Sequence, residues 1–513
     1  MYFKKSISAA ILCCCVLNSY SQNRNSVWCF GDSAGIDFNN LSNPQPIHSN
    51  EKSRGSCATI CDSTGHLLFY SGYNTQGMFG GPPDYNGEVY NNQNHVMQNG
   101  DLIISETWYQ EQVIIPMPDS SNKYYLFSIN VTGGLGLFYS VIDMALDSGR
   151  GAVTVKNSQL LNYSVAAAII SVRHGNGRDW WLLSRRSGSS IDEFYEYLVT
   201  PYGISGPFII QSGSSIDGNI YSFSFSNSGT KLLGFNEVGV IDLFDFDRCT
   251  GNIILNQTIS QAATMAPYPY YFGGEFSSDE HYLYVSQLGV AGQHPTYLKQ
   301  YDLTAPVISA TADTIWSYDS TEQAGGQLRL APDGKVYLAC AYHDGVHFNY
   351  PYPDSVFNTV NNNLSVINYP DSPGVACGFV PFSFNLGAGR CYWGLPNNPD
   401  YELGAVVNSM CDTVMQVGSM QLAVGNNSRL HVFYHAGWQV AFINAEGLKG
   451  MRFYLQVYDL FGRIIFSDEG SLNSEYYTKD LNCDGFAEGM YIVTLQTGPD
   501  GSGEKLVKRF IKQ

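Results

Sequence analysis

The feature that most constrains this chain is a motif that returns six times at a spacing of roughly 53 residues, a period in the range of repeat folds. Each copy has a turn residue, such as Gly or Asn, followed by a short run of apolar and aromatic residues. Ser, Asp and Gly lead into several copies, as the tight turn of a hairpin requires. The turn residues before the runs are spaced by 57, 55, 52, 51 and 54 residues, and they are Gly65, Asn122, Gly177, Gly229, Glu280 and Gly334.

This spacing predicts a β-propeller. Several short strands in each unit of about 40–55 residues are typical of propeller blades, which bury their faces by stacking in a ring. The region from Asn25 to Leu395 holds about seven such units. We therefore predict an all-β fold with a seven-bladed propeller, closed by residues 27–38 meeting residues 382–393. A row of separate β-sandwiches is the alternative, but it would need linkers and less even spacing.

Composition excludes several classes of protein. Only 14% of the 513 residues are charged while 14% are aromatic, which excludes disorder for most of the chain. The net charge is −18, and no cluster of Lys and Arg stands out. Nucleic acid is therefore not expected as a partner, because duplex binding needs clustered basic residues.

The N-terminus has the pattern of an export signal. Lys4 and Lys5 precede an apolar stretch at 7–17, and Ser19 and Ser21 are small residues at a cleavage position. Such a pattern predicts a signal peptide at 1–21, read by the Sec machinery, and about eleven apolar residues are too few for a membrane anchor. A lipoprotein signal is the competing interpretation. No later segment predicts a transmembrane helix.

Nine cysteines follow the predicted signal peptide, so at least one thiol is unpaired. An oxidising compartment allows disulfides. We expect Cys377 to pair with Cys391. Cys57 and Cys61 share one predicted strand and are too far apart to bridge each other. The nine are Cys29, Cys57, Cys61, Cys249, Cys340, Cys377, Cys391, Cys411 and Cys483.

An ordered set of short motifs resembles a large group of secreted Bacteroidetes proteins. The set opens with an aromatic pair and Phe-Gly at 26–31, in which Cys29 replaces the usual Tyr, and with Ala-Gly-Ile-Asp-Phe at 34–38. The resemblance covers about 25–413 and implies a propeller without known catalytic residues. Its other pieces lie at 56–58, 97–100, 139–144, 274–277, 327–337, 394–397 and 411–413.

The C-terminal part resembles the type A sorting domain of type IX secretion cargo. The matching stretches are 457–463, 489–493 and 505–509, which alone would predict a small antiparallel sandwich. The usual Pro-Asn-Pro start is absent near 420–445. The resemblance implies transfer by the type IX machinery to the outer-membrane surface or the extracellular space. The residues that carry the predicted sorting signal are Gly462, Arg463, Gly489, Tyr491, Lys505 and Lys508.

These patterns divide the chain into four parts. We predict a signal peptide at 1–21, a β-propeller-like domain at 22–413, a linker at 414–424 and a sorting domain at 425–513.

The sequence shows no nucleophile elbow, zinc-protease motif or phosphate-binding loop. His174 near Arg173 and Asp179 could form a polar site, although a turn histidine is the plainer interpretation. At least one of Trp180 and Trp181 is expected in the core. No cofactor or metal is expected, since the carboxylates of 242–247 alternate along a strand.

Aromatic-Pro loops are the candidate binding surfaces, since exposed Tyr offers a rigid contact area with a polar tip. The alternative is that these rings pack blade edges. The insertion at 72–112 could equally carry function or pack as a decorated loop. The candidate binding residues are Tyr268, Tyr270, Tyr271, Tyr350 and Tyr352.

We therefore expect a secreted, surface-displayed propeller that binds an extracellular glycan or protein. Two alternatives remain open. One is a hydrolase or lyase acting on extracellular polymer at the propeller channel. The other is a structural component of the surface layer.

Overall fold

The chain is described here from a computed structural model. The residues it describes are 23–73, 87–106, 108–131, 133–188, 191–216, 218, 220–264, 269–288, 295–318, 325–342, 356–407, 409, 411–412, 429–435, 439–446, 452–459, 461–471, 476–497 and 505–512.

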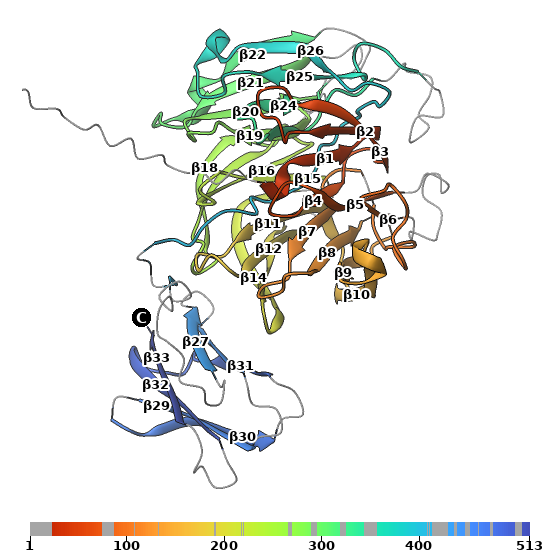
Figure 1. Cartoon of the computed structure of the whole chain (residues 1–513). Coiled ribbons are helices and arrows are strands. Elements are labelled where there is room, and N and C mark those ends of the chain that lie inside the picture. The colour runs from red at the N-terminus through yellow and green to blue at the C-terminus, as the bar shows by residue number, and fades with distance from the viewer. Residues whose placement is uncertain are drawn as a thin grey trace, which may run out of the picture.

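Seven antiparallel sheets follow one another along the described residues between 27 and 385 (Figure 1). The first two sheets have three named strands and the other five have four. The first three sheets contain β1 (Val27–Phe30), β2 (Asp32–Asp37) and β3 (Gln45–Lys52); β4 (Ala58–Cys61), β5 (Leu67–Tyr73) and β6 (Gly87–Asn91); and β7 (Gln112–Pro116), β8 (Lys123–Asn130), β9 (Gly136–Asp143) and β10 (Ala152–Leu161).

The next four sheets keep the same up-and-down order. They contain β11 (Val165–Arg173), β12 (Trp180–Arg186), β13 (Ile191–Thr200) and β14 (Gly203–Ile216); β15 (Tyr221–Phe225), β16 (Lys231–Asn236), β17 (Ile241–Phe246) and β18 (Ile253–Ser260); β19 (Tyr271–Phe276), β20 (Tyr282–Gln287), β21 (Thr296–Asp302) and β22 (Asp313–Tyr318); and β23 (Leu328–Leu330), β24 (Val336–Leu338), β25 (Asn363–Ile367) and β26 (Phe379–Asn385). Short 3-10 helices are η1 (Asn23–Asn25), η2 (Asp147–Gly149), η3 (Ile308–Thr311) and η4 (Gly374–Cys377).

The six repeated runs of the sequence become the second strand of six successive sheets, namely β5, β8, β12, β16, β20 and β24. The turn before each run joins it to the first strand of its sheet. At β16, for example, the backbone N–H of Gly229 donates to the Ser226 carbonyl at 2.8 Å, and Gly229 has a φ of +69° that favours glycine. The repeat prediction is confirmed.

The first strands β4, β7, β11, β15, β19 and β23 are the inner strands, and each contacts the next around a common axis. This arrangement of sheets is a β-propeller, so the predicted fold class is confirmed. The count of seven blades stays a prediction, because the sheets counted here cover the described residues only.

The two ends of the propeller meet as expected from the sequence. Asp32 and Arg390 exchange two backbone hydrogen bonds of 2.8 and 3.0 Å, and the Arg390 side chain also donates to the Asp32 carboxylate at 3.0 Å. The rings of Trp28 and Tyr337 pack edge to face, with centroids 6.0 Å apart. The first sheet and the chain after the last sheet therefore close the ring.

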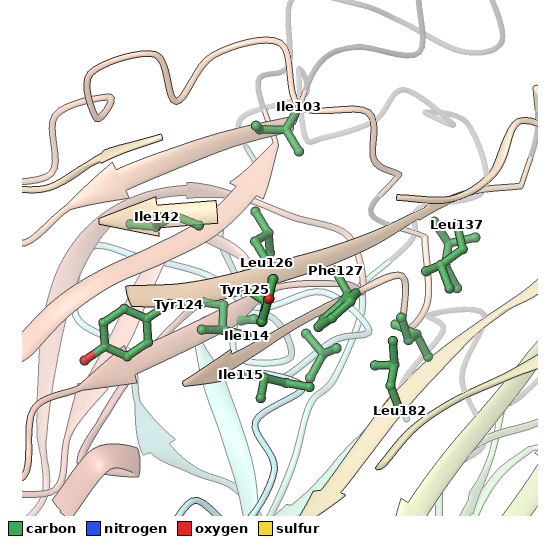
Figure 2. Close-up of a cluster of buried hydrophobic side chains, with 14 of the residues drawn as sticks. Ile103, Ile114, Ile115, Tyr124, Tyr125, Leu126, Phe127, Leu137, Ile142 and Leu182 are labelled. Atoms are coloured by element: carbon green, nitrogen blue, oxygen red, sulfur yellow. The ribbon is translucent and has the colours of Figure 1, made fainter. Parts of the chain in front are cut away.

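The core lies between neighbouring sheets. In the largest cluster, Ile114 and Ile115 of β7 pack with Phe127 of β8 and Leu182 of β12, all at most 1% exposed (Figure 2). Because successive strand residues point to opposite faces, a sheet covered on both sides needs apolar residues in continuous runs. This explains the unbroken apolar runs of the repeat.

The C-terminal part forms a separate small sandwich of two antiparallel sheets, which confirms that prediction. Leu455, Val457, Val493 and Leu495 are fully buried in its own core. One sheet has β27 (Arg429–His435), β28 (Val440–Glu446) and β31 (Tyr476–Asn482), and the other has β30 (Ile464–Ser471), β29 (Arg452–Tyr458), β32 (Gly489–Thr497) and β33 (Lys505–Lys512).

The four-part division of the chain stays a prediction. The signal peptide at 1–21 and the linker at 414–424 lie outside the described residues. Among the described residues, no helix has the length and apolarity needed to cross a membrane.

Candidate functional site

After β26 the chain returns to the propeller axis, where Asn397 is 2% exposed. Its amide nitrogen donates to the carbonyl oxygens of Gln112 and Ile169, each at 2.8 Å. Its amide oxygen accepts from Gln110 at 2.8 Å and from Arg329 at 2.7 Å. Because these partners come from three different sheets and a loop, one side chain fastens the returning chain to the inner wall.

Two further amides fill the middle of the channel. Gln327 donates to the Tyr109 carbonyl at 2.9 Å and accepts from the Leu395 N–H at 3.0 Å. Gln110 donates to the Phe223 carbonyl at 3.0 Å. The hollow that remains beside them holds about 10 Å³, about the space that one water molecule needs. The described residues thus close the channel in its middle and leave two separate ends.

We call the end where the inner strands begin the aromatic end, defined by Arg54, Trp108, Tyr109, Tyr270 and Trp393. The guanidinium carbon of Arg54 lies 4.2 Å from the centroid of the Trp108 ring and 5.4 Å from that of Trp393. The hydroxyls of Tyr109 and Tyr270 are 2.8 Å apart. All four aromatic residues are partly exposed. This end therefore presents aromatic rings around one stacked cation.

Phe272 forms the floor of the aromatic end and is 1% exposed. Its ring centroid lies 5.3 Å from those of both Tyr109 and Trp393. Burial raises the pKa of the Tyr109 and Tyr270 hydroxyls. Both hydroxyls therefore keep their protons at neutral pH. One of the two protons lies in the hydrogen bond between them, so one donor remains for a ligand.

Of the five candidate binding tyrosines, the structure places Tyr270 at the aromatic end. Tyr271 is 5% exposed and packs in the core between the fifth and sixth sheets. Tyr268, Tyr350 and Tyr352 lie outside the described residues. Binding by these tyrosines stays a prediction.

The insertion at 72–112 packs against the propeller in its described part, and a functional role for it stays a prediction. Isolated bridges join Gly87 to Ile103 and Tyr90 to Val96, so its described middle extends the second sheet as an irregular edge. Its last residues, including Trp108, reach the aromatic end. Part of the insertion, 74–86 and residue 107, lies outside the described residues.

The other end of the channel, where the inner strands end, holds a cavity of about 440 Å³ that we call the axial pocket. Its polar lining includes Ser171, Glu275, Arg329, Asn398 and Asp400. Phe225, Leu330 and Leu403 add apolar walls. The volume lies within the range of about 300–1,000 Å³ that is usual for small-molecule sites.

Glu275 is firmly held in the wall of this pocket. One carboxylate oxygen accepts from the Ser224 hydroxyl at 3.2 Å and from the Phe276 N–H at 3.0 Å, and the other accepts from the Leu330 N–H at 3.2 Å. Burial raises the pKa of Glu275, against the opposing charge of Arg329. Glu275 therefore serves mainly to join β19 to its neighbouring sheets.

Asp400 has a freer carboxyl group. One oxygen accepts from the Glu402 N–H at 2.9 Å. Within the described residues, its second oxygen has no hydrogen-bond partner. Burial raises the pKa of Asp400, while Arg173 and Arg248 oppose that rise. This carboxyl is available to a ligand in the axial pocket.

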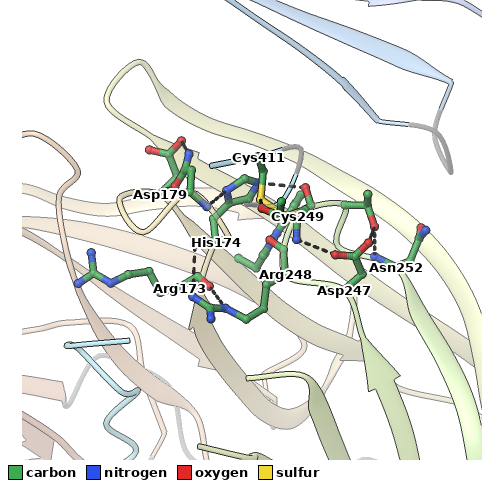
Figure 3. The surroundings of a disulfide bond; sticks show 12 residues. Arg173, His174, Asp179, Asp247, Arg248, Cys249, Asn252 and Cys411 are labelled. Carbon is green, nitrogen blue, oxygen red and sulfur yellow. Dashed lines mark hydrogen bonds between the residues drawn. A yellow bond between two sulfur atoms is a disulfide. The ribbon is translucent and has the colours of Figure 1, made fainter. Parts of the chain in front are cut away.

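A disulfide anchors the chain beyond the axial pocket, and it corrects the predicted pairing. Cys249 bonds to Cys411 across a separation of 162 residues (Figure 3). Cys377 and Cys391 are instead separate buried thiols. Cys377 lies in η4, where its thiol interacts with Tyr284, while Cys391 lies on the returning segment, with its thiol near the Cys340 carbonyl at 3.1 Å.

His174 is a turn residue beside that disulfide, as the plainer interpretation held. Its Nδ1 accepts from the Asn176 N–H at 3.0 Å, so its Nε2 donates to the Cys249 carbonyl at 3.1 Å. Burial lowers the pKa of His174. Both ring nitrogens therefore bond within the turn, which fits a structural role.

Trp180 and Trp181 are both fully buried, so the core takes both rings. In the stretch 242–247, Asp242 accepts from Ser214 and Thr258, and Asp245 pairs with Lys231. Within the described ranges, no three His, Cys, Asp or Glu side chains gather closely enough to hold a metal ion.

The predicted sorting residues occupy structural positions in the small sandwich. Gly462 has a φ of +77° in a turn capped by Asp459, whose carboxylate also accepts from the Arg463 side chain at 2.6 Å. Gly489 opens β32 with a φ of +146°, and Tyr491 is in the core. Lys505 and Lys508 are exposed on the edge strand β33. Their role in sorting stays a prediction.

Sequence reasoning did not single out Arg54, Trp108, Arg329 or Asn397. The resembling motifs at 274–277, 327–337 and 394–397 contain three residues of the axis, Glu275, Arg329 and Asn397. The presence of these residues in the resembling motifs was the available signal in the sequence. Only the fold shows that the three motifs meet at the propeller axis.

Comparison with known proteins identifies the C-terminal part. Residues 440–513 match the family described as secretion system C-terminal sorting domain, which is the sorting domain of type IX secretion. That domain implies secretion to the cell surface or the extracellular space. No curated protein matches the chain.

Two solved structures share low similarity with the chain. The periplasmic gluconolactonase PpgL of Pseudomonas aeruginosa is 11% identical, with a TM-score of 0.40, covering 66% of this chain and 90% of that one. The β-propeller domain of Cps50 (Swd1) from Myceliophteria thermophila is 10% identical, with a TM-score of 0.36, covering 62% of this chain and 94% of that one.

Proposed function

We propose that this propeller, secreted by means of its C-terminal sorting domain, binds an extracellular glycan at its aromatic end. The observation that carries the proposal is the gathering of Trp108, Tyr109, Tyr270 and Trp393 around Arg54. These residues come from distant parts of the chain and meet at one end of a closed channel.

The chemistry of these residues suits a sugar chain. Tyr and Trp combine a flat apolar face with a polar tip, so they can pack on the C–H face of a sugar and bond its hydroxyls. Stacking on Trp108 and Trp393 holds the Arg54 guanidinium in a fixed plane. The bonded pair of Tyr109 and Tyr270 hydroxyls adds one further donor, whose proton remains in place at neutral pH.

The secreted destination supports the same ligand class. A protein delivered to the cell surface or beyond meets polysaccharides as common large ligands. The closed channel favours contact with the outside of such a chain over threading it through the propeller.

The test is a glycan array probed with the full chain and with Trp108→Ala. We expect the full chain to retain at least one class of glycan. The variant should bind it at least tenfold more weakly, a change of about 1.4 kcal/mol. Tyr369→Ala is the matched control, because Tyr369 is 66% exposed and lies in the connection between β25 and β26. Equal binding by Trp108→Ala, or no glycan retained by the full chain, would contradict the proposal.

A polymer-degrading enzyme is the second candidate, favoured by two carboxyl groups with raised pKa, Glu275 and Asp400, in one pocket. Glycoside hydrolysis commonly uses such a pair. It ranks second because both Glu275 oxygens already accept hydrogen bonds inside the wall. Release of reducing ends from polysaccharides, lost in Asp400→Asn, would move it to first place.

A further inference from the structure

The axial pocket is built independently of the aromatic end. Its lining comes from the ends of β11, β15, β19 and β23 and from the returning chain at 396–400. The amides of Gln110, Gln327 and Asn397 lie between the two ends. A ligand in the pocket therefore meets a different set of side chains from a ligand at the aromatic end.

Arg329 gives the pocket an anion-binding group. Its Nη2 donates to the Asn397 amide oxygen at 2.7 Å. Among the described residues, its other guanidinium N–H groups have no hydrogen-bond partner. Burial lowers the pKa of Arg329, and the nearby Glu275 charge opposes that shift. Both carboxylate oxygens of Glu275 already accept hydrogen bonds from other groups. The remaining Arg329 N–H groups can therefore donate to a ligand.

Ser171 is the second group without a partner. It lines the pocket, is 2% exposed, and its hydroxyl oxygen has no hydrogen bond within the described part of the chain. A buried hydroxyl left unsatisfied is costly, so a ligand that bonds it gains correspondingly. The hydroxyl oxygen has almost no exposed surface as placed, so a ligand in the pocket reaches it after the Ser171 side chain rotates.

Asp400 supplies an acceptor in the same pocket. Its second carboxylate oxygen is open, as described above, and carboxylates accept hydrogen bonds from sugar hydroxyls. A ligand that matches these three groups carries an anionic group to accept hydrogen bonds from Arg329. It also carries hydroxyl groups to bond Asp400 and Ser171. A neutral sugar lacks the anion, and a simple carboxylate lacks the hydroxyls.

The size and closure of the pocket limit the ligand further. A volume of about 440 Å³ admits a small ligand, and residues 396–400 close its base. A polysaccharide can therefore enter the pocket only with one of its ends or with a side branch. The apolar walls formed by Phe225, Leu330 and Leu403 suit the C–H face of a sugar ring.

We propose that the axial pocket binds a carboxylate-bearing sugar, a uronic acid unit, with its carboxylate on Arg329 and its hydroxyls on Asp400 and Ser171. This site is separate from the aromatic end, and the inference does not rest on the function proposed there.

The test is titration of the full chain by calorimetry with galacturonic acid, digalacturonate, galactose and the methyl ester of galacturonic acid. We expect digalacturonate and galacturonic acid to bind. Galactose and the methyl ester should bind at least tenfold more weakly, because neither carries the negative charge. The ester tests the Arg329 contact without changing the protein, so the result does not depend on whether an Arg329 variant folds.

Ser171→Ala should weaken the binding of digalacturonate by about threefold to tenfold, the effect of losing one hydrogen bond. Ser184→Ala is the matched control, because Ser184 is also a fully buried hydroxyl without a partner within the described residues, but it does not line the pocket. Trp108→Ala should leave this binding unchanged, which separates it from the glycan site. Equal affinity for galactose and galacturonic acid, no uronate binding, or no effect of Ser171→Ala would overturn the proposal.

Discussion

The two ends of the propeller axis are made by the same repeated sheets, yet they differ in chemistry. At the axial pocket, the inner strands β15, β19 and β23 end in short turns that lead directly into the next strand. At the aromatic end, longer connections follow β6, β18 and β26, and their described residues include Trp108, Tyr109, Tyr270 and Trp393. A short turn keeps side chains close to the strand ends, whereas a long connection can carry large rings to the axis. The repeat therefore shapes one end, and the insertions shape the other.

The returning chain keeps these ends apart. Asn397 and its partners occupy the axis, so the pocket and the aromatic end share no open passage through the described residues. Each end can then change its ligand without disturbing the other. The predictions below test this separation, from the largest expected effect to the smallest.

Asn397→Ala should have the largest effect, because it removes four buried hydrogen bonds and leaves their partners unsatisfied. We expect the free energy of unfolding to fall by about 3–5 kcal/mol. Binding at both ends should weaken together, since both depend on the segment that Asn397 fixes. Denaturant unfolding measures the loss, with the exposed Asn40→Ala as control. A loss no larger than that of the control would contradict the role of Asn397.

Removing the disulfide should affect the pocket end more than the aromatic end. Cys411 lies beyond the pocket, and Arg248 fastens the same segment at the Gly404 carbonyl. We expect reduction, or the double change Cys249→Ser and Cys411→Ser, to lower the free energy of unfolding by about 2–4 kcal/mol. Reductant should not affect the double variant further. If the double variant bound the glycan more weakly but bound uronate normally, the prediction that the disulfide supports the pocket end would be wrong.

The pH dependence of stability gives a third comparison. Burial raises the pKa of Glu275 above its ordinary value of 4.5. Above pH 4.5 the unfolded chain therefore loses this proton first, and stability falls as the pH rises toward the folded pKa. One such group contributes at most about 1.4 kcal/mol per pH unit. Glu275→Gln should flatten the fall by that share, measured by unfolding between pH 4 and pH 8, whereas Tyr270→Phe should not.

Tyr270→Phe should have the smallest effect. It removes the hydroxyl that bonds Tyr109 and leaves the ring in place. We expect a loss of about 0.5–1.5 kcal/mol in stability and a glycan affinity reduced by severalfold. Uronate binding should not change. A total loss of glycan binding would show that the hydroxyl, and not the ring, is the main contact.

Much of the fold was predictable, because its signals are local. Turn residues and apolar runs are read over a few positions, so the strands β5, β8, β12, β16, β20 and β24 followed from the repeat. Ring closure was also foreseen, since the first and last strands of a propeller must meet. The sorting domain was recognised from the stretches 457–463 and 489–493 within its own compact core.

The site was less predictable, because its contacts join distant positions. Cys249 meets Cys411 only because the chain returns along the axis and emerges beside His174, and no spacing rule foresees that path. Arg54 stacks on Trp108 and Trp393 from two loops and the returning segment. Tyr270 was chosen for its aromatic-Pro loop, while Tyr271, the next residue, points into the core because strand neighbours face opposite sides.

The most direct test of this account is a crosswise titration of three proteins, the full chain, Trp108→Ala and Ser171→Ala. Each is titrated with digalacturonate and with the neutral glycan that the array identifies. The account predicts that Trp108→Ala binds the neutral glycan at least tenfold more weakly and keeps digalacturonate. It predicts that Ser171→Ala keeps the neutral glycan and binds digalacturonate about threefold to tenfold more weakly. If either variant weakened both ligands equally, the two ends would be one coupled site, and the separation of the axis by Asn397 would be wrong.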